Sequence, residues 1–226
     1  MNAFWIKVIA IAAMIVDHYA LLFYPDSFPL TVIGRLAFPL IAWLIANGAV
    51  HTHNIDKYLL RLGVFALIAQ IPVEIAHYIN GEFSLFLNVL WTLFLGLLAI
   101  RILKSARIPM PLQWTGVAAC IALGTLLHTD FASGGVLMIV AFYLTYGNAH
   151  AMILSQLFIM MILTKLSFFI APGFGAPFYM HPMEQYGVLA LPIILLYNGK
   201  RGYATGLAFY WFFVIQSFAI LLFTLY

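Results

Sequence analysis

The stretch Lys7–Phe23, KVIAIAAMIVDHYALLF, decides the fold class, because it is the body of an apolar run over residues 5–24. A membrane-spanning helix needs about 20 mostly apolar residues. Asp17 and His18 lie side by side in this run. Ionisable groups inside a membrane cost about 2.5–3.5 kcal/mol each on insertion scales, and they face a cavity or a partner. The run therefore predicts a spanning helix with a functional pair in its second half.

The composition extends this prediction to the whole chain. Of its 226 residues, 65% are hydrophobic and 8% are charged, whereas soluble domains are about 45–50% apolar and about 25% charged. We expect one all-α, polytopic transmembrane domain over residues 1–226. The single cysteine excludes a disulfide framework and a cysteine metal cluster. The net charge of +3 fits cytoplasmic loop charges, so nucleic acid is not an expected partner.

Apolar segments of spanning length recur along the sequence and predict about nine transmembrane helices. The predicted spans are residues 5–24, 30–50, 58–79, 83–103, 112–128, 132–147, 150–171, 183–198 and 204–226.

The loops between these spans alternate in charge. Positive residues mark the cytoplasmic side of a membrane protein. We therefore expect a multi-pass membrane protein with a cytoplasmic N-terminus. The basic loops contain Lys57, Lys104, Arg107, Lys200 and Arg201, and the acidic connections contain Asp26, Glu82, Asp130 and Glu184.

The polar residues of the spans converge on the outer leaflet when this topology is applied. A shared polar cavity open to the outer side would explain them together, because buried polar groups in membranes face cavities or partners. The residues concerned are Asp17, His18, Arg35, Gln70, Glu74, Asn88, Asp130, His181 and Glu184.

The adjacent Asp17 and His18 project about 100° apart on a helix, so each needs a partner on another span. Arg35 is the natural partner of Asp17, because a guanidinium binds a carboxylate through two hydrogen bonds. His18 is then available as a base near neutral pH. The alternative is a structural Asp17–Arg35 ion pair with His18 as a hydrogen-bond donor between helices.

Other charged residues allow two readings each. Arg61 is a candidate donor-binding residue, but its position near the inner end of a span also suits a side chain that reaches the cytoplasmic headgroups. Lys165, in the middle of a span, is either a functional cation or the partner of Glu74 or Glu184. His181 shares a Pro/Gly-rich outer segment with Glu184 and is a further binding candidate.

The histidines near the second loop do not predict a metal centre. His51 and His53 stand beside Asp56, but an HxH pair alone is a weak signal and a solvated loop explains it. The sequence contains no Walker loop, GxSxG, HExxH or dinucleotide-binding motif.

Several of these residues lie in segments that resemble a known family. The segments KVIAIAAMIVDHYALLF, IGRLAFPLIAWLIANGAVHT, YLLRLGVFALIAQIP and LNVLWTLFLGLL resemble the TraX family of conjugal transfer membrane proteins, including its TrbP-type members. The order of DH, GRLAFP, YLLRL and QIP carries the resemblance. The later TDFASGGVLMIVAFYL and LLYNGKRG resemble the looser second half of the family.

This resemblance implies an inner-membrane transferase, distantly like membrane acyltransferases, that N-acetylates a conjugative pilin subunit with acetyl-CoA as donor. The family has a histidine after an FY pair in its last span, whereas this chain has Gln216 and Ser217 there. If that histidine is essential for acetylation, this protein catalyses a different reaction. The residues that the resemblance singles out are Asp17, His18, Gly34, Arg35, Phe38, Pro39, Arg61, Gln70, Pro72, Asn88 and Asp130.

The predicted topology leaves other functions open. The site faces outward, but acetyl-CoA is cytoplasmic, so a phosphatidylglycerol donor is an alternative, with Arg35 and Lys165 binding its phosphate. Such an enzyme would transfer phosphoglycerol to the pilin at the periplasmic leaflet. A noncatalytic pilin assembly factor and a small transporter are the readings from other classes. Membrane lipids are expected contacts in each case.

Overall fold

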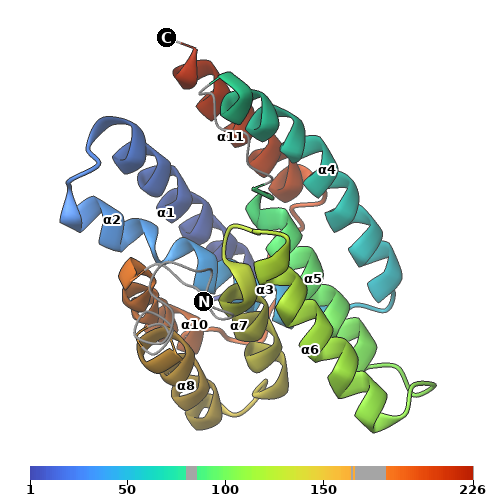
Figure 1. Ribbon diagram of the computed structural model, residues 1–226. Helices are drawn as coiled ribbons and strands as arrows, with labels where there is room; N and C mark the ends of the chain where they lie inside the picture. The colour runs from blue at the N-terminus through green and yellow to red at the C-terminus, as the bar shows by residue number, and fades with distance from the viewer. Residues whose placement is uncertain (80–85, 164, 166–181, 226) are drawn as a thin grey trace.

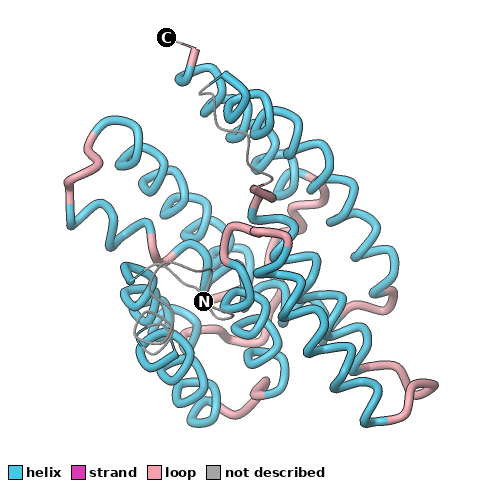
Figure 2. Tube along the Cα trace, in the orientation of Figure 1, coloured by secondary structure: helices cyan, strands magenta, loops and turns pink. Residues whose placement is uncertain are grey.

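The computed structural model describes residues 1–79, 86–163, 165 and 182–225, and these residues form a bundle of helices (Figures 1 and 2). Extended pairing within the described residues is limited to one bridge between Leu87 and Thr129. The predicted all-α class is confirmed. The helices are α1 Ala3–Phe23, α2 Phe28–Gly34, α3 Ala37–His51, α4 Ile55–Ile79, α5 Val89–Leu103, α6 Met110–Leu126, α7 Ala132–Leu144, α8 Ala149–Leu157, the π-helix η1 Phe158–Leu163, the 3₁₀ helix η2 Pro182–Ala190, α10 Leu191–Leu195 and α11 Ala208–Thr224.

Where the structure describes them, the predicted spans coincide with helical structure, but their lengths differ; parts of residues 83–103, 150–171 and 204–226 lie outside the described residues. Among the described residues, three segments are long and apolar enough to cross a membrane, namely Ala3–Phe23, Phe28–His51 and Ile55–Ile79. The remaining apolar helices have 10–17 residues, which is shorter than the about 20 that a full crossing needs. Membrane character therefore rests most firmly on the first third of the chain.

The second predicted span is two helices, because α2 ends at Gly34 and α3 begins at Ala37. Pro39 explains the break. A proline has no backbone N–H, so Pro39 gives no hydrogen bond to the carbonyl of Arg35 four residues earlier. Leu36 N–H instead bonds to Ile33 O at 3.2 Å, a tighter turn. The break places Arg35 between two helices, where its side chain can leave the helix axis.

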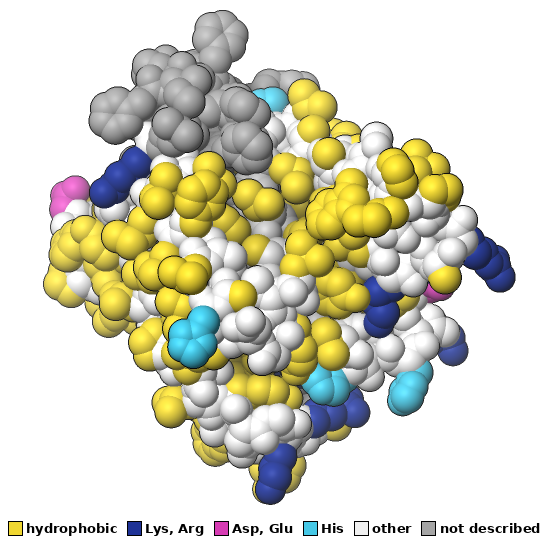
Figure 3. Space-filling view, turned by 90° about the horizontal axis from the view of Figure 1, so that it is seen from below, with side chains coloured by type: hydrophobic (Ala, Val, Ile, Leu, Met, Phe, Trp, Pro, Cys, Tyr) yellow, Lys and Arg dark blue, Asp and Glu magenta, His cyan; other side chains and the backbone are white. Residues whose placement is uncertain are grey.

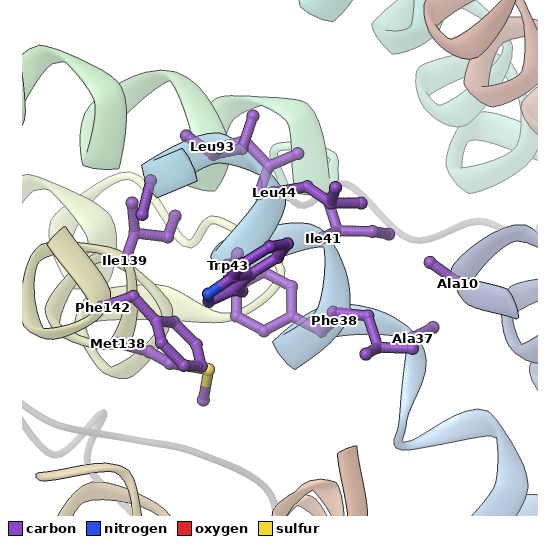
Figure 4. Packing of buried hydrophobic residues seen from close by; sticks show 14 of the residues in the cluster. Ala10, Ala37, Phe38, Ile41, Trp43, Leu44, Leu93, Met138, Ile139 and Phe142 are labelled. Atoms are coloured by element: carbon purple, nitrogen blue, oxygen red, sulfur yellow. The ribbon is translucent and has the colours of Figure 1, made fainter. Parts of the chain in front are cut away.

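Helix α3 is the centre of the bundle. Twelve of its fifteen residues are buried, and a helix that is apolar all round belongs in a core. Its neighbours are α1, α5, α7, η2 and α10. Figure 4 shows Phe38, Ile41 and Leu44 of α3 among side chains of the surrounding helices. The start of α3, beside Arg35, is therefore fixed by packing on several sides.

Helices α4 and α11 form a pair at one edge of the bundle, with α11 alongside α4 in Figure 1. Phe65 of α4 stacks on Tyr210 of α11 at 5.1 Å between ring centroids and meets Trp211 edge-on. Apolar side chains such as Leu67 and Ile215 are exposed on this pair. Exposed apolar surface of this kind suits contact with lipid tails.

Basic residues gather at one end of the bundle, where α4 begins and α5 ends. Arg101 Nε lies 2.7 Å from Asp56 Oδ1, and Lys104 Nζ donates to Ala49 O at 2.8 Å. Figure 3 shows Lys, Arg and His side chains spread over the lower face of the molecule. Asp17 and His18 lie in the opposite half of α1, so the bundle separates a basic end from the candidate site.

Candidate functional site

An ion triad joins three elements that are distant in sequence. Arg35 Nη2 donates to Asp17 Oδ1 of α1 at 2.9 Å, and Arg35 Nη1 donates to Glu184 Oε1 of η2. The predicted Asp17–Arg35 pair is therefore present. Glu184 is 6% exposed, while Arg35 and Asp17 are about one quarter exposed. The guanidinium thus has both terminal nitrogens occupied, and its buried Nε has no hydrogen-bond partner among the described residues.

Two glycines allow the three elements to meet. A Cβ on Gly34 would lie 2.1 Å from Asp17 Oδ1, so only glycine lets α2 approach α1 this closely. A Cβ on Gly187 would lie 2.8 Å from Pro39 Cγ and 3.2 Å from Arg35 O. Gly187 therefore brings η2, and with it Glu184, against the break before α3. The triad depends on these close approaches as much as on its charges.

His18 lies next to the triad on α1 and faces α11. Its Nδ1 is 2.8 Å from Met14 O, as expected for a ring N–H that donates to the helix backbone. Gln216 Nε2 of α11 lies 2.6 Å from His18 Nδ1 and 3.0 Å from Nε2. Because Met14 O can only accept, Nδ1 carries the ring proton and Nε2 is the unprotonated nitrogen, to which the Gln216 amide N–H can donate at 3.0 Å.

Asp130 sits on a turn that the fold holds in an unfavourable conformation. His128 and Ala132 have φ values of 47° and 43°, in the left-handed region that costs an L-residue about 1–2 kcal/mol. Asp130 N–H donates to Leu87 O at 3.0 Å, and Leu87 N–H donates to His128 O at 3.2 Å. Such strain persists where surrounding contacts over-determine the backbone, and it clusters at functional sites.

Aromatic packing connects this turn to the triad. The Phe131 ring stacks on Phe38 of α3, with centroids 3.6 Å apart and planes 10° from parallel. Phe38 lies three residues after Arg35. Asp130 thereby comes within electrostatic range of His18 and Arg35.

Acidic side chains outnumber basic ones in this cluster. Asp17 and Glu184 bind the guanidinium of Arg35, and Asp130 is close enough to interact electrostatically with Arg35 and His18. Desolvation by the surrounding groups raises the pKa of Asp130, although the residue keeps an exposed surface; His18 and Arg35 act in the opposite direction. The cluster therefore suits a cationic ligand better than an anionic one.

Three other predicted site residues form a separate network between α4 and α5. Gln70 Nε2 donates to Glu74 Oε1 at 2.7 Å, and Asn88 Nδ2 donates to Gln70 Oε1 at 2.8 Å. Asn88 also caps α5, since its Oδ1 accepts from Leu90 N–H at 3.0 Å. These bonds satisfy the amide groups within the network. Their geometry indicates a structural joint between α4 and α5, adjacent to the Leu87 bridge.

The remaining predicted site residues do not join the cluster. Arg61 is exposed near the start of α4 and donates through Nε to Lys57 O at 3.2 Å, so it lies at the basic end. Lys165 is exposed, and its two predicted partners make other bonds: Glu184 with Arg35, and Glu74 with Gln70. His181 lies outside the described residues.

Metal-ligating side chains are not grouped in the described part of the chain, where no three His, Cys, Asp or Glu residues are placed to hold an ion. His51 Nδ1 is 2.8 Å from Asn47 O, and Tyr146 donates to Asn47 Oδ1 at 2.8 Å. The His51 ring is therefore positioned by hydrogen bonding at the end of α3.

Comparison with known proteins identifies the family. The family model described as "TraX protein" matches residues 3–224. The chain belongs to the TraX family. A relative from Dichelobacter nodosus, described as a probable fimbrial assembly protein FimC of serogroup H1, is 32% identical over 234 residues, which cover 95% of this chain and 92% of the relative. No solved structure matches this TraX family member. The resemblance seen in its motifs is thus confirmed.

Two contacts of this TraX family member were not predicted. Gln216 occupies the position where the family has a histidine, and the structure places its side-chain amide against His18. Glu184 is one of two possible partners that the sequence offers for Lys165, but it binds Arg35. Neither contact has a local sequence signal, because the partners are 198 and 149 residues apart.

Proposed function

We propose that this TraX family member is a transferase of the bacterial inner membrane that acylates an amine of a pilin subunit, with acetyl-CoA as the donor. Family membership and the fimbrial relative support a role in the assembly of pili or conjugation machinery. The observation that carries the chemical proposal is the excess of carboxylates around Arg35 next to His18.

An ammonium group is the acceptor that this charge distribution favours. Two carboxylates bound to one guanidinium, with the third carboxyl group of Asp130 nearby, favour a cation over an anion. A pilin amine is cationic near neutral pH, so it is drawn to Asp130, which has no hydrogen-bonded side-chain partner in the described cluster. His18 Nε2 is the proton acceptor that converts the bound ammonium into a nucleophilic amine.

The transfer step then follows ordinary acyl chemistry. The neutral amine nitrogen attacks the thioester carbonyl carbon and forms an N–C bond. The C–S bond breaks, and the thiolate leaves with the sulfur electron pair. His18 gives the proton that it took from the ammonium to the departing thiolate, and it then takes the second proton from the acylated nitrogen and releases it to water. Arg35 acts in this scheme by holding Asp17 and Glu184 in place, because its terminal nitrogens are already bound to them.

Phosphoglycerol transfer from phosphatidylglycerol has less support at this site. Arg35 was the predicted phosphate ligand, and here it is enclosed by Asp17 and Glu184. A phosphate would have to displace a carboxylate and then face the two that remain. One observation favours a noncatalytic assembly factor. The description of the Dichelobacter nodosus relative names fimbrial assembly and no catalytic activity.

The proposed orientation places the N-terminus in the cytoplasm. The basic end that contains Arg101 and Lys104 then faces the cytoplasm, in agreement with the distribution of positive charge in membrane proteins. The cluster around Arg35 lies toward the periplasmic side. Membrane lipids contact the exposed apolar side chains of α4 and α11.

Intact mass spectrometry of the cognate pilin tests this proposal. Pilin is purified from cells that contain the gene and from cells in which it is deleted. We expect the deletion to lower the pilin mass by about 42 Da for one acetyl group; a loss of about 154 Da would identify phosphoglycerol instead. Identical masses together with lost pili would contradict a transferase and favour the assembly factor.

A further inference from the structure

We infer that Lys7, Arg201 and the glycine-rich loop Gly199–Gly206 form a binding site for the phosphate groups of a coenzyme A thioester, at the end of the bundle opposite the Arg35 cluster. This inference deepens the proposed function, because it assigns the entry point of the acyl donor. The loop has the sequence GKRGYATG.

The loop packs against the first turn of α1. Ala3 N–H donates to Lys200 O at 2.9 Å, and Phe4 N–H donates to Arg201 O at 3.2 Å. Gly199, Gly202 and Gly206 have φ values of 77°, 72° and 53°. A left-handed residue next to a right-handed one can direct successive backbone N–H groups into a concave anion-binding turn. The loop is therefore shaped and anchored by α1 while it carries two basic side chains.

Lys7 is the observation that points to an anion. It is half-buried, and its Nζ donates to Thr205 Oγ1 at 3.1 Å and lies 5.7 Å from the Phe209 ring centroid. The charged neighbour that acts on it is Arg201, which has the same sign. No carboxylate is paired with Lys7 in the described part of the chain. Two neighbouring cations without an acid are stabilised by a bound anion, and phosphate suits ammonium and guanidinium groups.

A ligand that contacts both Lys7 and His18 must be long. The two residues are eleven apart in α1, which places them about 16 Å apart along the axis and about 20° apart around it. Both face α11, Lys7 at Phe209 and His18 at Gln216. The pantetheine arm of coenzyme A separates phosphates from a thioester over a comparable length. A cytoplasmic donor bound at Lys7 thus reaches His18 with its acyl group.

Binding measurements on purified protein in nanodiscs of phosphatidylcholine test this inference. The probe is radiolabelled coenzyme A, with Lys7→Gln, Lys7→Arg and Arg201→Gln compared with wild type. Lys57→Gln is the matched control, an exposed lysine at the same end. We expect the affinity to fall at least tenfold in Lys7→Gln and Arg201→Gln, and to stay near wild type in Lys7→Arg and Lys57→Gln. Adenosine 3′,5′-bisphosphate should compete with the probe.

Phospholipid headgroups carry the same phosphate chemistry, so a second arm measures phosphatidylglycerol retained by wild type and Lys7→Gln in native mass spectrometry. Lys7-dependent lipid retention without coenzyme A binding supports the phosphate site and overturns the thioester as its ligand. Equal binding of both probes by wild type and Lys7→Gln overturns the site. If Lys7 binds coenzyme A while the pilin mass never changes, the site stands and the proposed pilin transferase fails.

Discussion

The carboxylate of Asp17 fills the space that a side chain on residue 34 would occupy: a Cβ on Gly34 would lie 2.1 Å from Asp17 Oδ1. The contact joins α1 to the end of α2, one residue before Arg35. The geometry of the ion triad therefore depends on glycine at position 34 as well as on the charged side chains.

Gly34→Ala should separate α1 from α2 and move Asp17 away from Arg35. Overpacking of this kind costs about 1–3 kcal/mol, so we expect lower stability in detergent together with loss of pilin modification. Thermal unfolding and pilin mass measure the two effects. Gly63→Ala is the control, since its Cβ would meet a movable Phe94 ring at 3.2 Å. Equal behaviour of the two variants would contradict the role of Gly34.

Glu184→Ala should destabilise the protein more than Asp56→Ala, which removes one partner of an exposed ion pair. It leaves Arg35 with one carboxylate, and breaking a buried ion pair from one side costs about 3–5 kcal/mol; the partial exposure of Arg35 places the expected loss near the lower limit. Asp56→Ala breaks the exposed Asp56–Arg101 pair and should cost less than about 1 kcal/mol. Denaturant unfolding of both variants provides the comparison.

Asp130→Asn should separate activity from stability. The pKa of Asp130 is raised, so the folded protein binds this proton more tightly than the unfolded chain, and ionisation of Asp130 at neutral pH destabilises the fold. The asparagine removes that penalty, which increases as pH rises. We expect unchanged or higher thermal stability at pH 7 and a loss of about tenfold in transfer to a cationic acceptor. Lower stability with full activity would contradict this role.

Gln216→Glu should change the pH dependence of transfer. A carboxylate beside His18 stabilises the imidazolium form, and a protonated ring cannot accept a proton from the acceptor amine. The acidic limb of the pH–rate profile should therefore move to higher pH, with Gln216→Ala retaining the position of the wild-type limb. Rates measured across a pH series decide this, and an unmoved limb in Gln216→Glu would show that His18 is not the base.

The sequence predicts the broad arrangement because hydropathy and charge are local properties. The apolar runs predict the helices, and Asp17 with Arg35 predicts the ion pair that the structure contains. The break at Arg35 follows from Pro39. Hydropathy predicts one continuous span there, because the whole of residues 30–50 is apolar enough to cross a membrane. The contacts of Glu184 and Gln216 depend on how η2 and α11 pack, which no local pattern encodes.

Polar residues also look alike in sequence whether they act in chemistry or in structure. Gln70, Asn88 and Asp130 belong to the same predicted leaflet. Their contacts in the structure distinguish them. Gln70 and Asn88 hydrogen-bond to each other, whereas Asp130 interacts electrostatically with His18. Their division into a structural joint and a candidate site required the geometry.

The central claim is that His18 is the proton acceptor of a pilin-modifying reaction. The most direct measurement is the mass and modification site of the cognate pilin, by tandem mass spectrometry, from cells that express wild type, His18→Ala or the exposed control His150→Ala. The claim predicts an acyl group on a pilin amine in wild type and His150→Ala, and an unmodified amine in His18→Ala at equal protein abundance. A fully modified pilin from the His18→Ala cells would contradict it.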